Sequence, residues 1–214
     1  MVSGKVRIKF QKTGKLKFIS HLDLMRTMKG ALGRANVPLK YSEGFNPHPK
    51  MVFSLPLPVG AESVCEYLDV TLTEVRDEEK LQEEINAQLT KDLVVTEIYP
   101  VDMDLREIVG AEYDFSFKDL SEEELRSALD GPLMIEKHSK KGMLTVDLRP
   151  KIASYAIESD GAGCKMHAKL GVDGGEFVNP ELFVRSLEIK AGKPIEYYSI
   201  LRTSLYVAGG KTFR

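Results

Sequence analysis

The stretch from Phe18 to Arg26, Phe-Ile-Ser-His-Leu-Asp-Leu-Met-Arg, contains the signals that begin an α-helix. Ser20 is a preferred N-cap residue, and Asp23 stands three positions later, where a capping-box partner belongs. Apolar residues then recur at helical spacing to about residue 35 and leave a polar, basic opposite face. The stretch therefore predicts an amphipathic helix over residues 21–35 with a basic outer surface.

A loop of unusual composition follows this helix and ends in Gly44-Phe45-Asn46-Pro47-His48-Pro49-Lys50. Each proline restricts the residue before it to an extended conformation, which stiffens residues 46–49. The glycine permits a positive φ before this stiff segment. Side chains suited to binding are carried by this loop: Tyr41, Phe45, Asn46, His48 and Lys50. Aromatic, amide, imidazole and ammonium groups on a stiff loop beside a basic helix predict a binding surface.

The first 50 residues are strongly basic. They contain eleven Lys and Arg and two acidic residues, a net charge of +9, whereas the remaining 164 residues carry a net charge of −11. A basic end attracts polyanions, although such charges can also be no more than solvated surface. Because the charges coincide with the unusual loop, we favour a surface for nucleic acid.

Length and composition predict a cytoplasmic globular protein with no membrane contact. A chain of 214 residues with 43% hydrophobic residues can form one large domain or two smaller ones. No apolar run approaches the roughly 20 residues that cross a membrane, and the N-terminus lacks the apolar segment of a signal peptide. Two cysteines, Cys65 and Cys164, fit a reducing compartment.

The order of expected elements predicts an α+β fold. In the first half we expect a strand, a helix, two strands, a helix and a strand, at residues 5–12, 21–35, 51–57, 66–73, 77–89 and 93–101. This is the split βαβ, ferredoxin-like order. The second half repeats the plan with an added strand or hairpin, at residues 112–117, 120–129, 133–137, 143–148, 152–157, 165–170, 180–189 and 199–207. We predict two tandem ferredoxin-like domains, 1–103 and 104–214.

No complete catalytic or cofactor motif is present in the sequence. Two cysteines cannot supply the three thiolates that hold the iron–sulfur cluster of a radical enzyme. Gly209-Gly210-Lys211-Thr212 resembles the end of a phosphate loop, but Leu205 stands where the first glycine is required. Cys164 and His167, three apart on an expected strand, point to opposite faces. We therefore expect no metal site and no cofactor.

Several candidate residues admit two interpretations. His21 is either a partly buried, hydrogen-bonded histidine or part of an anion site at the helix N-terminus. Arg26 and Arg34 are either solvated charges or phosphate contacts. Asp23 is interpreted as a helix cap rather than as an acid or base. Arg149, at an expected strand end, either joins the basic surface or pairs with Asp147.

Four runs carry a resemblance to a known family: His21 to Arg26, Tyr41-Ser42-Glu43-Gly44-Phe45-Asn46-Pro47-His48-Pro49-Lys50, Leu55 to Gly60, and Glu66-Tyr67-Leu68-Asp69. With the later Asp147-Leu148-Arg149-Pro150, they resemble the radical-SAM-linked protein family. Its members are bacterial domains found beside, or fused to, radical S-adenosylmethionine (SAM) proteins. The resemblance implies a radical SAM partner, with RNA modification or other RNA metabolism as the setting, but no reaction.

These observations lead to one prediction and two alternatives. We predict an accessory RNA-binding module, not an enzyme on its own, that presents tRNA or ribosomal RNA to the radical SAM partner. Nucleic-acid contacts are expected from Arg7, Lys9, His21, Arg26, Arg34, Tyr41, Phe45, Asn46, His48, Lys50 and Arg149. One alternative is a metal-independent endoribonuclease of tandem ferredoxin-like type, with His21 or His48 as general acid–base. The other is a protein-interaction scaffold for the partner.

Overall fold

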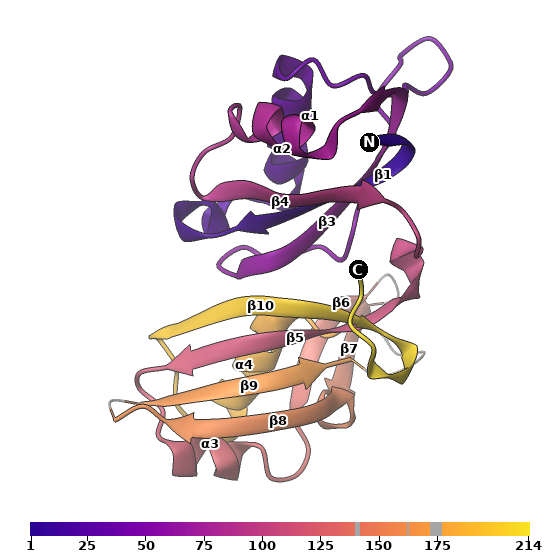
Figure 1. The fold of residues 1–214 in the computed structure, drawn as a ribbon. Coiled ribbons are helices and arrows are strands. Elements are labelled where there is room, and N and C mark those ends of the chain that lie inside the picture. Colours follow the sequence, from indigo (N-terminus) through magenta and orange to yellow (C-terminus); the bar gives the residue numbers. More distant parts are fainter. Residues whose placement is uncertain (140–141, 162, 172–176) are drawn as a thin grey trace. The chain divides into compact units, whose positions relative to one another are not determined.

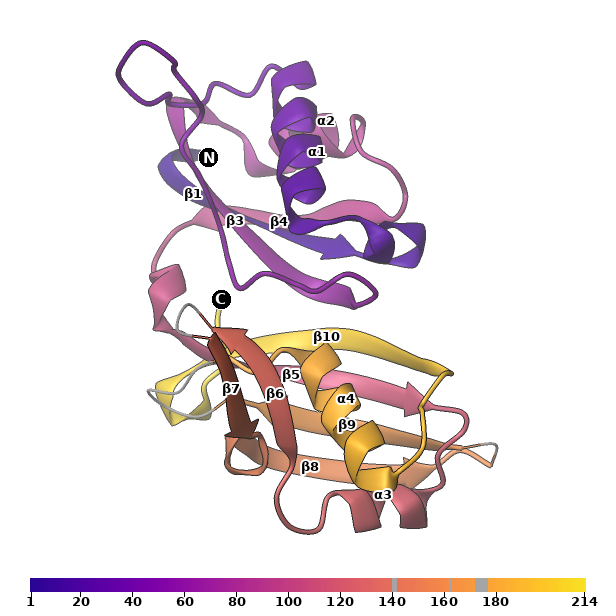
Figure 2. The same cartoon turned by 180° about the vertical axis from the view of Figure 1, so that it is seen from behind.

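The computed structural model describes residues 1–139, 142–161, 163–171 and 177–214. The chain is mixed α+β, as predicted. It divides into two compact units, Met1–Glu107 and Ile108–Arg214, whose boundary lies four residues after the predicted position. In each unit, helices cover one face of antiparallel strands (Figures 1 and 2).

The first unit contains four strands and two α-helices among its described elements. These are β1 (Val2–Lys12), α1 (His21–Arg34), β2 (Met51–Phe53), β3 (Glu62–Arg76), α2 (Glu78–Asn86) and β4 (Leu93–Pro100). Strand β1 pairs antiparallel with β3 and β4, and β2 pairs with β3, so the order is β4-β1-β3-β2. Strand β2 is shorter than predicted and β3 is longer. Helix α1 has the predicted start and ends one residue early.

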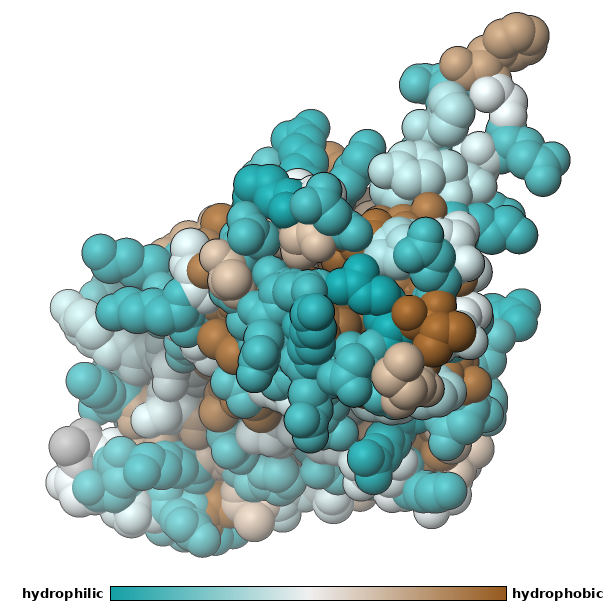
Figure 3. All heavy atoms as spheres, turned by 45° about the horizontal axis from the view of Figure 1, so that its top comes forward, coloured by the Kyte–Doolittle hydropathy of each residue, from teal (hydrophilic) through white to brown (hydrophobic). Residues whose placement is uncertain are grey.

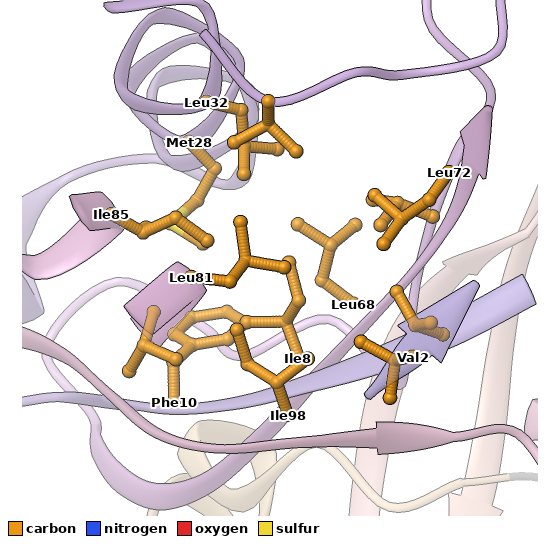
Figure 4. Packing of buried hydrophobic residues seen from close by; sticks show 14 of the residues in the cluster. Val2, Ile8, Phe10, Met28, Leu32, Leu68, Leu72, Leu81, Ile85 and Ile98 are labelled. Atoms are coloured by element: carbon orange, nitrogen blue, oxygen red, sulfur yellow. The ribbon is translucent and has the colours of Figure 1, made fainter. Parts of the chain in front are cut away.

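Alternation along β1 builds the core of the first unit. Val6, Ile8 and Phe10 are fully buried and point towards the two helices, which contribute Met28 and Leu81 among others. Figure 4 shows Ile8 and Phe10 meeting Met28 and Leu81 between the helices and the strands. Burial of each large apolar side chain contributes roughly 1.5–3 kcal/mol. The core therefore holds α1 at a fixed position on the sheet and leaves its other face in solvent.

The second unit has one hairpin more than the first. Its elements are β5 (Ile108–Phe117), α3 (Glu122–Ala128), β6 (Met134–Ser139), β7 (Gly142–Asp147), β8 (Ile152–Ser159), β9 (Cys164–Leu170), α4 (Pro180–Ala191) and β10 (Tyr198–Val207). The main strands run in the order β10-β5-β9-β8, and β6 with β7 forms a separate two-stranded sheet. Residues 140 and 141, which separate the predicted strands at 133–137 and 143–148, lie outside the described residues.

Candidate nucleic-acid interface

The predicted loop is a short antiparallel ribbon, which we call the 40–50 ribbon. Tyr41 and Pro49 form a bridge, flanked by two backbone hydrogen bonds. The Ser42 N–H donates to the His48 carbonyl (2.8 Å), and the Lys50 N–H donates to the Lys40 carbonyl (3.0 Å). At its base, the Lys40 N–H donates to the carbonyl of Thr71 in β3 (2.7 Å). The ribbon is thus tied to the sheet and protrudes from the first unit (Figure 1).

An exposed aromatic side chain stands at the tip of the ribbon. Gly44 has a φ of 121°, a value that side chains disfavour, and it turns the chain there. Phe45 is fully exposed, and its neighbour Asn46 is exposed as well. Figure 3 shows the ribbon standing out from the surface with apolar atoms at its end. The tip therefore presents a phenyl ring and an amide to solvent on a defined backbone.

Ser42 fixes the side chain of His48. The serine Oγ lies 3.0 Å from the imidazole Nδ1 and accepts the His48 backbone N–H at 3.1 Å. The Asn46 carbonyl is the next polar atom, 3.4 Å from Nδ1. Within the described part of the chain Nε2 makes no hydrogen bond, so this nitrogen is the one available to a ligand.

The outer face of α1 is basic and exposed, as predicted. The Arg26 side chain is 74% exposed and reaches Asp23, with 3.1 Å between Nη1 and Oδ1. Arg34 is also exposed, and its Nη2 donates to the Gln88 carbonyl at 3.0 Å. Lys29 is exposed between them. These contacts are weak, solvent-screened ones, which a phosphate group can replace.

The start of α1 supports the interpretation of Asp23 as a structural residue. Ser20 Oγ accepts the Asp23 backbone N–H (3.1 Å), and its hydroxyl donates to Asp23 Oδ2 (2.7 Å). The hydroxyl, followed by Arg26, lowers the pKa of the Asp23 carboxyl. The stabilisation by this ionised carboxyl is present above its unfolded-state pKa and is lost as the pH falls through the lower, folded-state pKa.

We expect Ser20→Ala to lower the free energy of unfolding by about 0.5–2 kcal/mol, because an N–H of the first turn loses its acceptor. Asp23→Asn removes only an exposed charge and should cost less. Urea titrations of both variants measure the difference, with Ser20→Thr as the control that keeps a hydroxyl. If the Asp23→Asn protein has a normal melting temperature but does not bind RNA, Asp23 belongs to the binding surface and not to the helix cap.

His21 belongs to the packed side of the helix start. Its ring meets Phe53 of β2 edge-on, with 5.6 Å between ring centroids, and it is only half-buried. No hydrogen bond or ring contact joins His21 to His48 within the described residues. The structure therefore does not join His21 and His48 into one acid–base pair, and His21 is occupied by an aromatic contact.

Two predicted phosphate contacts on β1 have partners inside the protein. Arg7 was expected on an exposed outer face, but it is fully buried. Its Nε lies 2.7 Å from Oδ1 of the buried Asp69, and its Nη2 donates to the Met103 carbonyl (2.6 Å). Lys9 is partly exposed and pairs with Glu97 at 2.7 Å. Arg7 is paired inside the protein because the sheet register places it directly opposite Asp69 on β3.

Arg149 is engaged within the second unit. Its Nε donates to the Leu129 carbonyl at 3.1 Å, and its guanidinium lies 5.7 Å from the ring centroid of Tyr155. Asp147 accepts the Arg149 backbone N–H at 2.9 Å instead of pairing with its side chain. Arg149 thus holds a strand end in place.

Comparison with known proteins identifies the family. Residues 5–180 match the model of a family described as an uncharacterized protein conserved in bacteria, DUF2344. The chain belongs to this DUF2344 family. No curated protein matches it. Among solved structures, it is similar to an unknown protein from Galdieria sulphuraria, with 10% identity over 96% of this chain and 98% of the other and a TM-score of 0.29.

The DUF2344 match spans the helix, the ribbon and the sheet that supports them. Sequence analysis of this family member overlooked Ser42 and Lys40, since only the ribbon register sets them opposite His48 and Lys50. It also overlooked an exposed pair in the second unit, Asp114 and His167, with 2.7 Å between Oδ1 and Nδ1. Their adjacency arises from the pairing of β5 with β9, and no local signal could have revealed it.

The described residues of this DUF2344 chain contain neither a candidate membrane-spanning helix nor a candidate metal site. None of its helices there has the length and apolar character needed to cross a membrane. The same residues contain no group of three or more His, Cys, Asp or Glu that could hold a metal ion. The free cysteines Cys65 and Cys164 are both buried, and burial raises the pKa of the Cys164 thiol to about 11.

Proposed function

We propose that this protein is an accessory RNA-binding module that presents RNA, tRNA or ribosomal RNA, to a radical SAM partner enzyme in the cytoplasm. The observation that carries the proposal is the fully exposed Phe45 at the tip of a hydrogen-bonded ribbon. A phenyl ring on a preorganised backbone is a stacking platform, and stacking of a base on such a ring contributes roughly 1–3 kcal/mol.

Charge around the ribbon supports the same function. The exposed cationic side chains of α1 and the ribbon are Arg26, Lys29, Arg34, Lys40 and Lys50. The acidic Asp23 is engaged by Ser20 and Arg26. A cationic surface beside an aromatic platform is the combination with which proteins bind single-stranded nucleic acid. Arg7 and Arg149 stand outside this set, because Arg7 is buried and Arg149 belongs to the second unit.

We further propose that both units are ferredoxin-like domains. In the first unit, support comes from the order β4-β1-β3-β2 with both helices on one face. In the second, β10-β5-β9-β8 follows the same plan with the β6–β7 hairpin inserted. In other proteins, sheets of this fold bind RNA bases by stacking them on aromatic side chains. This comparison is an analogy of fold alone.

A radical SAM partner would supply any chemistry. The resemblance of residues 21–26 and 41–50 to radical-SAM-linked proteins motivates this part of the proposal. With two cysteines in its sequence, the chain cannot hold the required cluster by itself. Affinity purification of the tagged chain from its own host should recover a protein with a three-cysteine motif, and its absence from repeated purifications would contradict the partnership.

Replacement of Phe45 with alanine tests RNA binding. We expect Phe45→Ala to lower affinity for single-stranded RNA about tenfold or more, because the stacking platform is lost while the fold is unchanged. Gel-shift titration measures the loss. Tyr197→Ala is the matched control, since this ring is 64% exposed but lies in the second unit. Equal losses in both variants, or no binding by the wild type, would contradict the proposal.

The same gels test the endoribonuclease alternative. A binding module leaves the length of the RNA unchanged in every variant. If instead the wild type cuts RNA, replacing its general acid–base histidine should slow cleavage by about 10²–10⁴-fold while binding persists. His21→Ala and His48→Ala separate the two candidate histidines. If the wild type cleaves RNA and one of these variants binds RNA but no longer cleaves it, the protein is an endoribonuclease and our proposal is wrong.

A further inference from the structure

The hydrogen bonds of the 40–50 ribbon sort its side chains onto two faces. Directly opposite residues of an antiparallel pair share a face, and successive residues alternate. Tyr41 and Pro49 form one opposite pair, flanked by Lys40 with Lys50 and by Ser42 with His48. One face therefore carries Tyr41 and the buried Pro49. The other face carries the two ammonium groups, the hydroxyl and the imidazole.

The geometry points to this second face as the receptor for one backbone phosphate of the bound RNA. The inference rests on the proposed function and names the chemical group that is recognised. Lys40 and Lys50 are exposed, and their ammonium groups make no ion pair or hydrogen bond within the described residues. Two ammonium groups and an imidazole N–H are donors that suit the oxygens of a phosphodiester.

We infer the tautomer of His48 from its contacts with Ser42. One hydroxyl can accept the His48 backbone N–H and at the same time donate its own proton to Nδ1. Both bonding roles of the hydroxyl are then used, and the ring proton lies on Nε2. The other tautomer would direct an Nδ1 proton at the hydroxyl and at the more distant Asn46 carbonyl. His48 thus offers a donor to the phosphate, and Ser42 is its positioning residue.

The tautomer is measured in the free protein, without RNA. We expect ¹⁵N NMR of the imidazole at about pH 8.5, above the pKa of an ordinary imidazole, to show His48 as the Nε2–H form. His48→Gln assigns the signal. Ser42→Ala should mix the two tautomers, whereas Ser42→Thr should restore the wild-type spectrum. A wild-type His48 protonated on Nδ1 would overturn the donor role, whether or not the protein binds RNA.

The phosphate receptor is tested with inorganic phosphate and with modified RNA. Phosphate titration should shift the Ser42 and His48 signals in the wild type but not in the double variant Lys40→Gln/Lys50→Gln. The control is Lys15→Gln, at an exposed lysine outside the ribbon. In single-stranded RNA, one neutral methylphosphonate linkage should weaken binding by the wild type but not by the double variant.

The outcomes of these tests separate the two proposals. The double variant should also lower the slope of log K against log[salt] by about 0.7, because one phosphate contact is lost. If the wild type binds RNA but the double variant keeps its slope and its phosphate shifts, the receptor is wrong and the RNA module stands. If the wild type binds phosphate through these residues but no RNA, the RNA module fails instead.

Discussion

Replacing Asp69 with alanine is expected to lower the free energy of unfolding of the first unit by about 3–5 kcal/mol. Asp69 is 2% exposed and meets the fully buried guanidinium of Arg7 through both carboxylate oxygens, at 2.7 and 3.1 Å. Removing the carboxylate takes away the ion pair that the buried guanidinium makes with Asp69. Most of the expected loss comes from the Arg7 charge that stays buried. The ion pair itself contributes little net stability, because its formation required removing both charged groups from water.

Hydrogen exchange of the β1 and β3 amides measures this loss, since their protection reports the opening of the first unit. Glu97→Gln is the matched control. It breaks the ion pair with Lys9, in which both side chains are partly exposed, and should cost no more than about 1 kcal/mol. Replacing Arg7 and Asp69 together with Met and Leu should recover most of the stability. Equal losses for Asp69→Ala and Glu97→Gln would contradict the burial of this pair.

RNA affinity is expected to fall about 50-fold between about 50 and 200 mM salt. The estimate takes one phosphate contact from each of the three exposed cations of α1 and one from the ribbon face that carries Lys40 and Lys50. Each contact on a single strand contributes about −0.7 to the slope of log K against log[salt], which gives roughly −2.8 for four. The effect arises from the release of counter-ions condensed on the RNA, and so it is independent of sequence.

Titrations at several salt concentrations measure this slope. Replacing Arg26 and Arg34 with glutamine should reduce it by about 1.4 and weaken binding to all sequences alike. Arg149→Gln is the control, because its guanidinium is engaged within the second unit and should leave the slope unchanged. An affinity that does not vary with salt would exclude an electrostatic interface and favour a scaffold for a protein partner.

Signals between residues near in sequence predicted much of the fold. The Ser20 hydroxyl caps the Asp23 N–H three residues away, and the start of α1 was therefore predicted correctly. Ser121 and Glu124, also three residues apart, form a capping box at α3. The apolar alternation along β1 likewise indicated which side chains enter the core. Caps and periodicity involve neighbours in the chain, so no knowledge of the tertiary structure was needed.

The ribbon was predicted in composition but not in arrangement. Glycine and two prolines indicated a stiff, exposed segment, and Phe45 and His48 were correctly expected to be exposed. The pairing of Tyr41 with Pro49 was not predicted, although it decides which side chains share a face. The contact between Ser42 and His48 depends on the register of the ribbon, and the geometry of the turn sets that register. The sequence alone therefore did not predict it.

The sequence by itself determined the α+β class, the capped basic helix and the exposed loop, since each depends on residues within a few positions of one another. Tertiary structure alone decided that Arg7 is buried and Lys50 is exposed. Both are single basic residues in extended segments, and alternation assigns each only to a face. Whether that face meets a carboxylate depends on the strand alongside, and Asp69 stands 62 residues from Arg7. The pairing of neighbouring strands therefore decides that Arg7 is a buried, paired cation and that Lys50 is exposed to solvent.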